Sequence, residues 1–329
     1  MGDLMAESRI RVRAYFLFDN RTGRNWADPV SNWLQATEEE QAIQFFDELG
    51  RRVDFIRSLY KRYRVNLKPG EGLALALDEA EALARGDKVK GPSSQEELIR
   101  VVNDAHVIYA IGGSLETCVS AGLDVSRHLP NLTTGTTDYG TPSTDQKSIF
   151  LKDFEFETFI ASALIRSGLI PAFTEPGDPS GDLILGGILI EAKHPNSVGQ
   201  LAKLLGKFNR ALETIGHFGV FAVALEDVMK MGDVSEFDSQ AEYEAWITAK
   251  REGMEAIGQR LIPLAARLPR IAALLQSQTK VEIVGSGTTM RRLGSSVLFD
   301  HRPSFPNYET TARAIATSFN PNPVLYSTL

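Results

Sequence analysis

Two short apolar runs joined by a Gly-Gly pair constrain the fold of this 329-residue chain more than any other segment. The runs cover residues 183–185 and 188–190, and Gly186-Gly187 between them suits the positive φ angles of a tight β-hairpin turn. A turn centred on this pair places Asp182 directly opposite Glu191. Both arms are apolar on successive residues, which is typical of a sheet that is covered on both faces.

Three charged side chains are predicted to converge at the open end of this hairpin. Asp182 and Glu191 project to one side as an opposed pair, and Lys193 shares that side because side chains alternate along a strand. Two carboxylates this close repel each other unless a cation lies between them, and Mg²⁺ prefers such oxygen ligands. A lysine beside the ion can orient a water or stabilise the charge on a phosphate under attack. The pattern predicts a metal-dependent phosphodiesterase site rather than a solvated ion pair.

The spacing of Asp182 and Glu191-Ala192-Lys193 resembles the signature of the PD-(D/E)XK nuclease superfamily. Upstream, residues 156–169 are similar to the first core helix of restriction-endonuclease-like members. That helix usually begins with a Phe-Glu pair and ends at a glycine before the first strand. The resemblance covers about a quarter of the chain and implies an α-β-β-β-α-β core.

The resemblance also implies a role for each residue of the motif. Asp182, Glu191 and the Ala192 carbonyl would bind Mg²⁺, for which Mn²⁺ would substitute. Lys193 would orient the attacking water. Glu157, the acid of the Phe-Glu pair, would add an acid that supports the metal or its water. Glu157, Asp182, Glu191 and Lys193 are therefore the predicted catalytic residues.

Two alternatives stay open within this resemblance. Glu155 lies two residues before Glu157 and so on a different face of the helix, but Glu157 matches the Phe-Glu position better. The family motif has a proline directly before the aspartate, whereas Pro179 lies three residues before Asp182. Asp178 is therefore a second candidate for the metal-binding aspartate, although the hairpin register places it beyond the motif.

An amphipathic helix is predicted over residues 197–210, with leucine and phenylalanine side chains along one face. The other face carries Gln200, Lys203, Lys207 and Arg210, and residues 194–212 contain no acid. Positive charge beside a metal site suits a phosphate backbone, so we predict that these four residues contact nucleic acid. Residues 217–225 indicate a buried strand that completes the α-β-β-β-α-β order.

The first 131 residues are predicted to be mainly helical. An apolar stripe from Phe46 to Tyr63 and a capping box at residues 94–97 support this prediction. Basic residues between Arg51 and Arg64 are interpreted as a solvated helix end rather than a nucleic-acid surface. Residues 132–148, rich in Thr, Gly, Pro and Ser, predict a linker. The expected fold is α/β, with a helical N-terminal domain (1–131) and a nuclease-like domain with a mixed central sheet (149–329).

Two further features are expected towards the C-terminus. Residues 226–244 are rich in acids, which predicts an exposed loop that leads into a helix from about Tyr243. Pro263 and Pro269 are expected to break or kink that helix. Residues 281–284 and 296–299 predict two more strands joined by a hairpin loop.

Composition limits the class of protein. The single cysteine, Cys118, cannot form an internal disulfide, and no apolar run approaches the length of a membrane span. We therefore expect a cytoplasmic protein with no membrane partner. The net charge of −7 argues against nonspecific coating of nucleic acid, although it allows a local basic groove. The sequence has no histidine and cysteine spacing typical of zinc sites and no Walker loop.

Together these patterns predict a metal-dependent phosphodiester hydrolase, specifically a DNA endonuclease of a restriction or phage-defence type. Two other functions stay open. One is a noncatalytic nucleic-acid-binding or assembly module that keeps the fold, and the other is a ribonuclease on the same site. Cutting both strands of a duplex would favour a homodimer, and a partner protein that controls activity is also left open.

Overall fold

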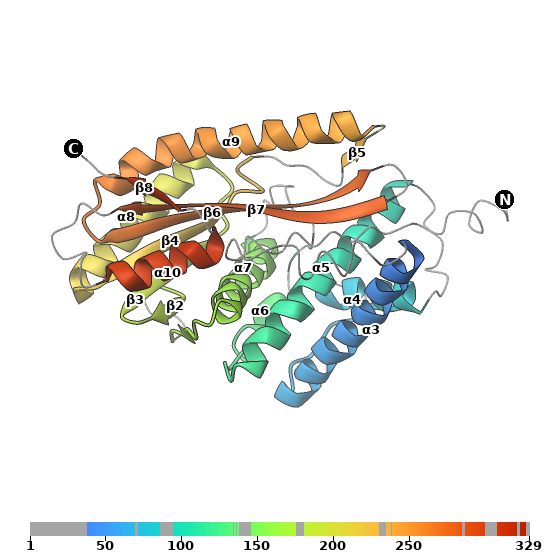
Figure 1. The fold of residues 1–329 in the computed structure, drawn as a ribbon. Helices are drawn as coiled ribbons and strands as arrows, with labels where there is room; N and C mark the ends of the chain where they lie inside the picture. Colours follow the sequence, from blue (N-terminus) through green and yellow to red (C-terminus); the bar gives the residue numbers. More distant parts are fainter. Residues whose placement is uncertain are drawn as a thin grey trace.

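The computed structural model describes residues 38–69, 72–85, 95–133, 135, 137, 146–175, 181–229, 235–237, 239–284, 287–299, 308–320 and 323–326. Figure 1 gives the labels of the helices and strands in these segments. None of the helices in these segments is both long enough and apolar enough to cross a lipid bilayer.

A mixed β-sheet lies at the centre of the molecule (Figure 1). The strands are β1 (Ala172–Phe173), β2 (Leu183–Leu185), β3 (Ile188–Lys193), β4 (Phe218–Ala224), β5 (Ser235–Phe237), β6 (Ile271–Val284), β7 (Gly287–Phe299) and β8 (Val324–Tyr326). They lie in the order β1-β2-β3-β4-β6-β7-β8, and β5 pairs with β6 beside this path. The pairs β1–β2, β2–β3 and β6–β7 are antiparallel, and the other pairs are parallel. The predicted α/β class with a mixed sheet is confirmed.

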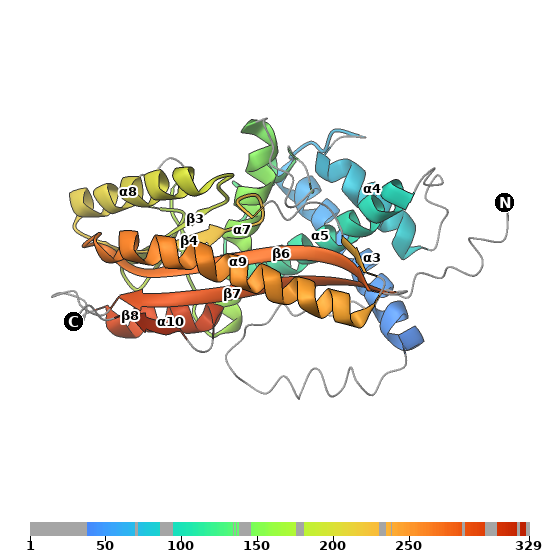
Figure 2. The same ribbon diagram turned by 90° about the horizontal axis from the view of Figure 1, so that it is seen from above.

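Helices cover both faces of this sheet (Figures 1 and 2). The helices α8 (Val198–Ile215) and α9 (Gln240–Ala266) lie on one face, and α7 (Gln146–Arg166) and α10 (Glu309–Phe319) lie on the other. Side chains of β4 alternate between the two: Val220 and Ala222 pack towards α7, whereas Phe221 packs towards α8 and α9. This double burial explains why successive residues of the strands are apolar.

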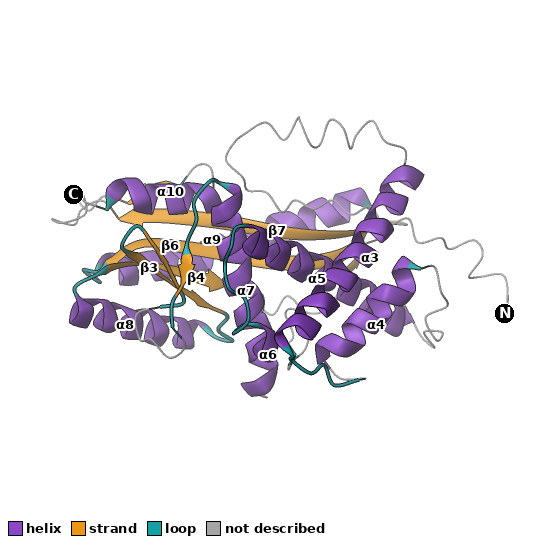
Figure 3. Cartoon of the chain, turned by 90° about the horizontal axis from the view of Figure 1, so that it is seen from below, coloured by secondary structure: helices purple, strands orange, loops and turns teal. Residues whose placement is uncertain are grey.

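Three further helices form the predicted helical half of the chain (Figure 3). They are α3 (Glu38–Tyr63), α4 (Gly72–Ala84) and α5 (Gln95–Ser120). Helix α5 packs against α7, and the other two pack against α5. The predicted apolar stripe of α3 is confirmed, because Leu49, Val53 and Ile56 are fully buried. The hydrophobic cluster that contains these side chains continues through α7 to the sheet. The proposed domain boundary stays a prediction, and one continuous core joins the residues on its two sides.

The segment between the two halves contains more helix than the sequence predicted. The short helix α6 (Leu129–Leu132) extends to the first residue of the predicted linker, and α7 begins at Gln146, before its end. The residues from 138 to 145 lie outside the described part of the chain.

The prediction of an exposed acidic loop after β4 is wrong at its first two residues. Glu226 and Asp227 are buried. Positive charge from elsewhere in the chain makes this possible, because Lys152 Nζ of α7 lies 3.0 Å from Asp227 Oδ1. His194, directly after β3, lies 3.6 Å from the same carboxylate. A buried charge is tolerated when such partners surround it.

The C-terminal elements are longer than predicted. Helix α9 begins at Gln240, where the Ser239 hydroxyl accepts a hydrogen bond from the Glu242 backbone N–H. It continues through Pro263 to Ala266, so the helix does not break at Pro263, and a kink there stays a prediction. The two predicted strands belong to the long antiparallel pair β6–β7, which confirms a hairpin in this region. They do not pair with each other, because residues 287–295, which were predicted as loop, form the first part of β7.

Candidate active site

The β2–β3 hairpin forms in the predicted register, with Leu183 opposite Ile190 and Leu185 opposite Ile188. Gly186 and Gly187 have φ angles of 53° and 80°, a conformation that favours glycine. The strand pairing ends one step before the predicted pair of Asp182 and Glu191.

At that step the pairing shifts by one residue, so that Asp182 bonds to Ile190, which is already the partner of Leu183, and not to Glu191. The Asp182 N–H donates to the Ile190 carbonyl over 2.8 Å, and Gly181 before it has a φ of 120°. The Asp182 carboxylate nevertheless remains beside β3, because its Oδ2 accepts the Ala192 N–H over 2.8 Å. The two acids therefore lie at one end of the hairpin, although not as a regular strand pair.

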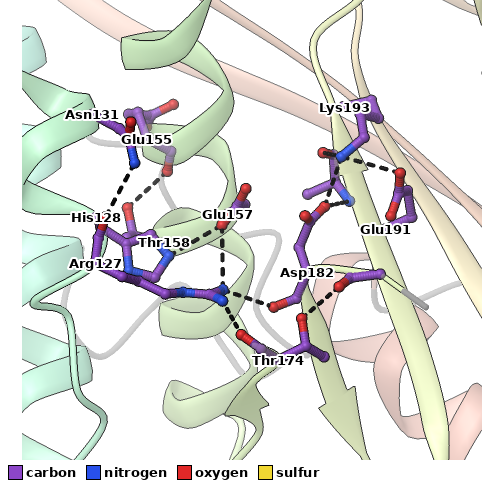
Figure 4. Close-up of polar contacts among 12 residues, drawn as sticks. Arg127, His128, Asn131, Glu155, Glu157, Thr158, Thr174, Asp182, Glu191 and Lys193 are labelled. Atoms are coloured by element: carbon purple, nitrogen blue, oxygen red, sulfur yellow. Dashed lines mark hydrogen bonds and ion pairs between the residues drawn. The ribbon is translucent and has the colours of Figure 1, made fainter. Parts of the chain in front are cut away.

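Lys193 joins the two acids (Figure 4). Its Nζ lies 3.0 Å from Asp182 Oδ2 and 3.1 Å from Glu191 Oε1. The same ammonium donates to the Ala192 carbonyl over 3.0 Å. Three oxygen atoms thus surround one positive charge, and they belong to the three residues that the resemblance assigns to metal binding.

Glu157 lies beside this group on α7, and its side chain reaches towards the residues before α6. Its Oε2 is 3.1 Å from His128 Nε2 and 3.7 Å from Arg127 Nη2. Figure 4 shows Glu157, and not Glu155, on the side of α7 that faces Asp182. The alternative aspartate, Asp178, lies outside the described residues.

A further acid, the half-buried Asp153, lies one helical turn before Glu157. Its carboxylate accepts the His194 backbone N–H over 3.0 Å. Burial raises the pKa of Asp153 to about 6, although the nearby Lys193 and His194 charges lower it. Burial, helped by the neighbouring Asp182 charge, raises the pKa of Glu157 to about 9. Negative charge is therefore unfavourable on these two carboxyls.

The pKa values of Glu191 and Lys193 are also shifted by burial and by neighbouring charges. Burial also raises the pKa of Glu191, and the Asp182 charge acts in the same direction. Burial alone would lower the pKa of Lys193, but the Asp182 and Glu191 carboxylates outweigh it and keep the ammonium charged. An additional cation would relieve the repulsion among these acids.

The donor atoms fit a hard divalent cation. Within the described segments, no cluster of three or more His, Cys, Asp or Glu side chains is arranged as a metal site. The oxygens of Asp182, Glu191 and Ala192 instead converge on the Lys193 ammonium, which marks the position that suits a cation. Carboxylate and carbonyl oxygens are the ligands that Mg²⁺ and Mn²⁺ prefer. The residues fit such an ion if the ammonium turns aside.

The predicted nucleic-acid-binding residues lie on α8. Lys203, Lys207 and Arg210 are exposed, as predicted for the polar face of this helix. The positive charge of Lys207 acts on Glu191 and lowers the pKa of that carboxyl, so this lysine is within electrostatic reach of the acids. Gln200 is half-buried, and its side-chain oxygen accepts the Asn196 N–H over 3.0 Å. Gln200 thus helps to shape the start of α8.

Three residues in this group were not predicted from the sequence. Asp153 lies four residues before Glu157, so the helical spacing was a usable signal. Arg127 and His128 precede α6 and reach the site only because α6 packs against α7. No local pattern in the sequence indicates that contact.

Comparison with protein-family models found no matching family, and searches of curated proteins and of solved structures found no significant match. The geometry of the residues themselves is therefore the basis for assigning a function.

We expect Glu157→Gln to flatten the pH dependence of stability in the metal-free protein. The pKa of Glu157 is raised from 4.5 to about 9, so the folded state holds this proton more tightly than the unfolded chain. The stability that the protonated carboxyl contributes is complete below its unfolded pKa and is lost as the pH rises towards its folded pKa. Glutamine does not ionise. In EDTA, the variant should melt a few degrees above the wild type near pH 8.5.

The same melting curves near pH 4 are the control, because below the unfolded pKa of 4.5 the Glu157 carboxyl is mostly protonated in both the folded and the unfolded protein. A wild-type protein that gains stability relative to Glu157→Gln as the pH rises would contradict the prediction.

Proposed function

We propose that this chain is a Mg²⁺-dependent phosphodiester hydrolase, with DNA as its substrate, of a restriction or phage-defence type. The observation that carries the proposal is the convergence of the Asp182, Glu191 and Ala192 oxygens on one cationic position beside Lys193. A solvated ion pair would not require this arrangement, and it would not be surrounded by further buried acids such as Glu157.

The order of elements around the hairpin supports the proposal. Helix α7 is followed by β1, β2 and β3, then by α8 and β4. The first three strands are antiparallel neighbours, and β4 lies parallel to β3. This is the α-β-β-β-α-β order that the resemblance to PD-(D/E)XK nucleases implies. Fold alone does not determine function, so the proposal depends on the side chains.

Each residue can be given a chemical role. Asp182, Glu191 and the Ala192 carbonyl would hold the ion, which when bound acidifies a water and polarises the phosphate. Lys193 keeps its charge and would donate a hydrogen bond to the attacking water or to a phosphate oxygen. Glu157 and its proton would complete the hydrogen bonds around the site.

The proposal is tested by incubating the purified chain with supercoiled plasmid, single-stranded DNA and RNA in Mg²⁺, Mn²⁺ or EDTA. We expect nicked or linear plasmid with either metal and intact plasmid in EDTA. Asp182→Asn should lose the activity, which would show that no contaminating nuclease is responsible. Glu309→Gln is the matched control, because this carboxylate forms an exposed ion pair with Arg313 on α10.

Each other outcome identifies an alternative. Cleavage of RNA alone would indicate a ribonuclease on the same site. Binding of nucleic acid without cleavage under any condition would favour a noncatalytic module. Equal cleavage by Asp182→Asn would overturn the assignment of the site.

Removal of the α8 charges is expected to weaken DNA binding in a salt-dependent way. The combined change of Lys203, Lys207 and Arg210 to alanine removes three exposed cations from α8, of which Lys207 acts on the charge of Glu191. Each phosphate contact contributes about 0.9 to the slope of log affinity against log salt, so the slope should fall by about 2 to 3. Fluorescence anisotropy with labelled duplex, in the Asp182→Asn background, measures this without cleavage.

The matched control changes Lys61, Arg62 and Arg64 to alanine at the end of α3, which we interpret as a solvated helix end. This variant should keep the affinity and the salt slope of its parent. A larger loss from the α3 variant than from the α8 variant would place the DNA on the helical half.

A further inference from the structure

We infer that Arg127, from the helical half of the chain, is a positioning residue that holds Asp182 in the candidate active site. The guanidinium donates through Nη1 to the Thr174 carbonyl and through Nη2 to the Asp182 carbonyl, the latter over 3.1 Å. The same Nη2 lies 3.7 Å from Glu157 Oε2. Arg127 therefore contacts the backbone or side chain of two predicted catalytic residues (Figure 4).

These contacts fix the two ends of the chain segment that leads into the hairpin. The Thr174 N–H donates to the Asp182 carbonyl over 3.1 Å, and the Thr174 hydroxyl donates to the Gly181 carbonyl. The Asp182 carbonyl thus accepts from Thr174 and from Arg127 together. Because the carbonyl and the carboxylate belong to one residue, fixing the former limits the directions in which the latter can point. The carboxylate is then held towards Ala192 and Lys193.

The surroundings hold the arginine itself in place. Its guanidinium carbon lies 5.0 Å from the centre of the Phe173 ring, and the His128 ring lies 4.1 Å from the same ring. Asn131 donates to the Arg127 carbonyl over 3.1 Å. These contacts link the residues before and within α6 to β1.

The geometry separates a positioning role from direct binding of a phosphate. Both terminal nitrogens of Arg127 already donate to carbonyl oxygens of the chain, and only 19% of the side chain is exposed. A phosphate-binding arginine needs free donors that face the substrate. Loss of Arg127 should therefore slow the reaction without weakening the affinity for DNA.

The inference rests on the proposed function and is tested with Arg127→Ala and Arg127→Lys. Misplacement of Asp182 by about 1 Å should lower kcat about 10²-fold, with KM for DNA unchanged. Affinity for Mn²⁺, measured by calorimetry without DNA, should fall several-fold. Hydrogen exchange at the Thr174 and Asp182 amides should accelerate. Lysine can keep the charge but not both carbonyl bonds, so Arg127→Lys should be intermediate.

Arg57→Ala is the matched control in the same helical half. Its guanidinium pairs with Asp78 and Glu81 at the surface, 2.7 Å from each, and makes no contact with the hairpin. This variant should match the wild type in every measurement. Millimolar guanidinium should restore part of the activity of Arg127→Ala and leave Arg57→Ala unchanged, an effect that a general loss of stability would not produce.

The outcomes distinguish this inference from the proposed function. If the wild type cleaves DNA and Arg127→Ala matches it in kcat, Mn²⁺ affinity and exchange, the inference is wrong and the proposed function stands. If Arg127→Ala does not fold, Arg127→Lys with wild-type kcat and Mn²⁺ affinity would overturn the inference in the same way. If the wild type neither cleaves nucleic acid nor binds Mn²⁺, the proposed function fails and the inference fails with it.

Discussion

Lys193→Met should bind a divalent cation at least as tightly as the wild type, while its rate of DNA cleavage falls about 10³-fold. The Lys193 ammonium lies within 3.1 Å of both predicted metal-binding carboxylates and competes with a cation for their oxygens. Methionine keeps much of the volume of the side chain but carries no charge. The affinity of the acids for a divalent cation should therefore rise. The rate of cleavage should fall, because the group that would stabilise the reacting water or phosphate is lost.

Calorimetry with Mn²⁺ and a plasmid-cleavage time course measure the two effects separately. Lys61→Met, at the exposed end of α3, is the matched control and should behave as the wild type in both. Loss of metal binding in a folded Lys193→Met protein would contradict this prediction, because it would make the lysine a structural support of the acids. Cleavage within tenfold of the wild type would also contradict it.

Lys152→Met should destabilise the protein by about 3 kcal/mol. Lys152 and Asp227 form a pair over 3.0 Å, and their side chains are only 1% and 3% exposed. Removal of the ammonium leaves a buried carboxylate without its nearest cation, which costs far more than loss of a surface pair. The pKa of Asp227 is lowered despite burial, because His194 and Lys152 favour its charged form. The stability of the fold therefore depends on this charged group.

Thermal unfolding measures this effect, and the melting temperature should fall by several degrees. The double variant Lys152→Met/Asp227→Asn should recover part of the loss, since it removes both charges together. Lys61→Met should change stability by less than about 0.5 kcal/mol. An equally small change in Lys152→Met would show that the buried pair contributes little.

The parts of the site that depend on local signals could be predicted from the sequence. The Gly186-Gly187 pair determines the hairpin register, and the helical spacing of leucines determines α8. The one-residue shift at Asp182 could not be predicted in this way, because it depends on the backbone of Gly181 and on the contact with Ala192. A register argument assumes that regular pairing continues to the end of the strand.

The parts that depend on distant residues were missed or wrong. An acid-rich segment predicts exposure, yet Glu226 and Asp227 are buried because Lys152 and His194 reach them from other elements. Arg127 reaches the site for the same kind of reason, since its partners at Thr174 and Asp182 lie far along the chain. Single-sequence patterns describe neighbours within a helix or hairpin and contain little information about such contacts.

The hydrophobic core that runs from α3 through α7 into the sheet has a consequence for how such a protein can change over generations. Genetic exchange that joins the first half of one relative to the second half of another would combine side chains that had not adapted to each other. We expect such hybrids to lose solubility unless several interior positions are exchanged together. Substitutions at core positions in one half should therefore be accompanied by compensating substitutions in the other half.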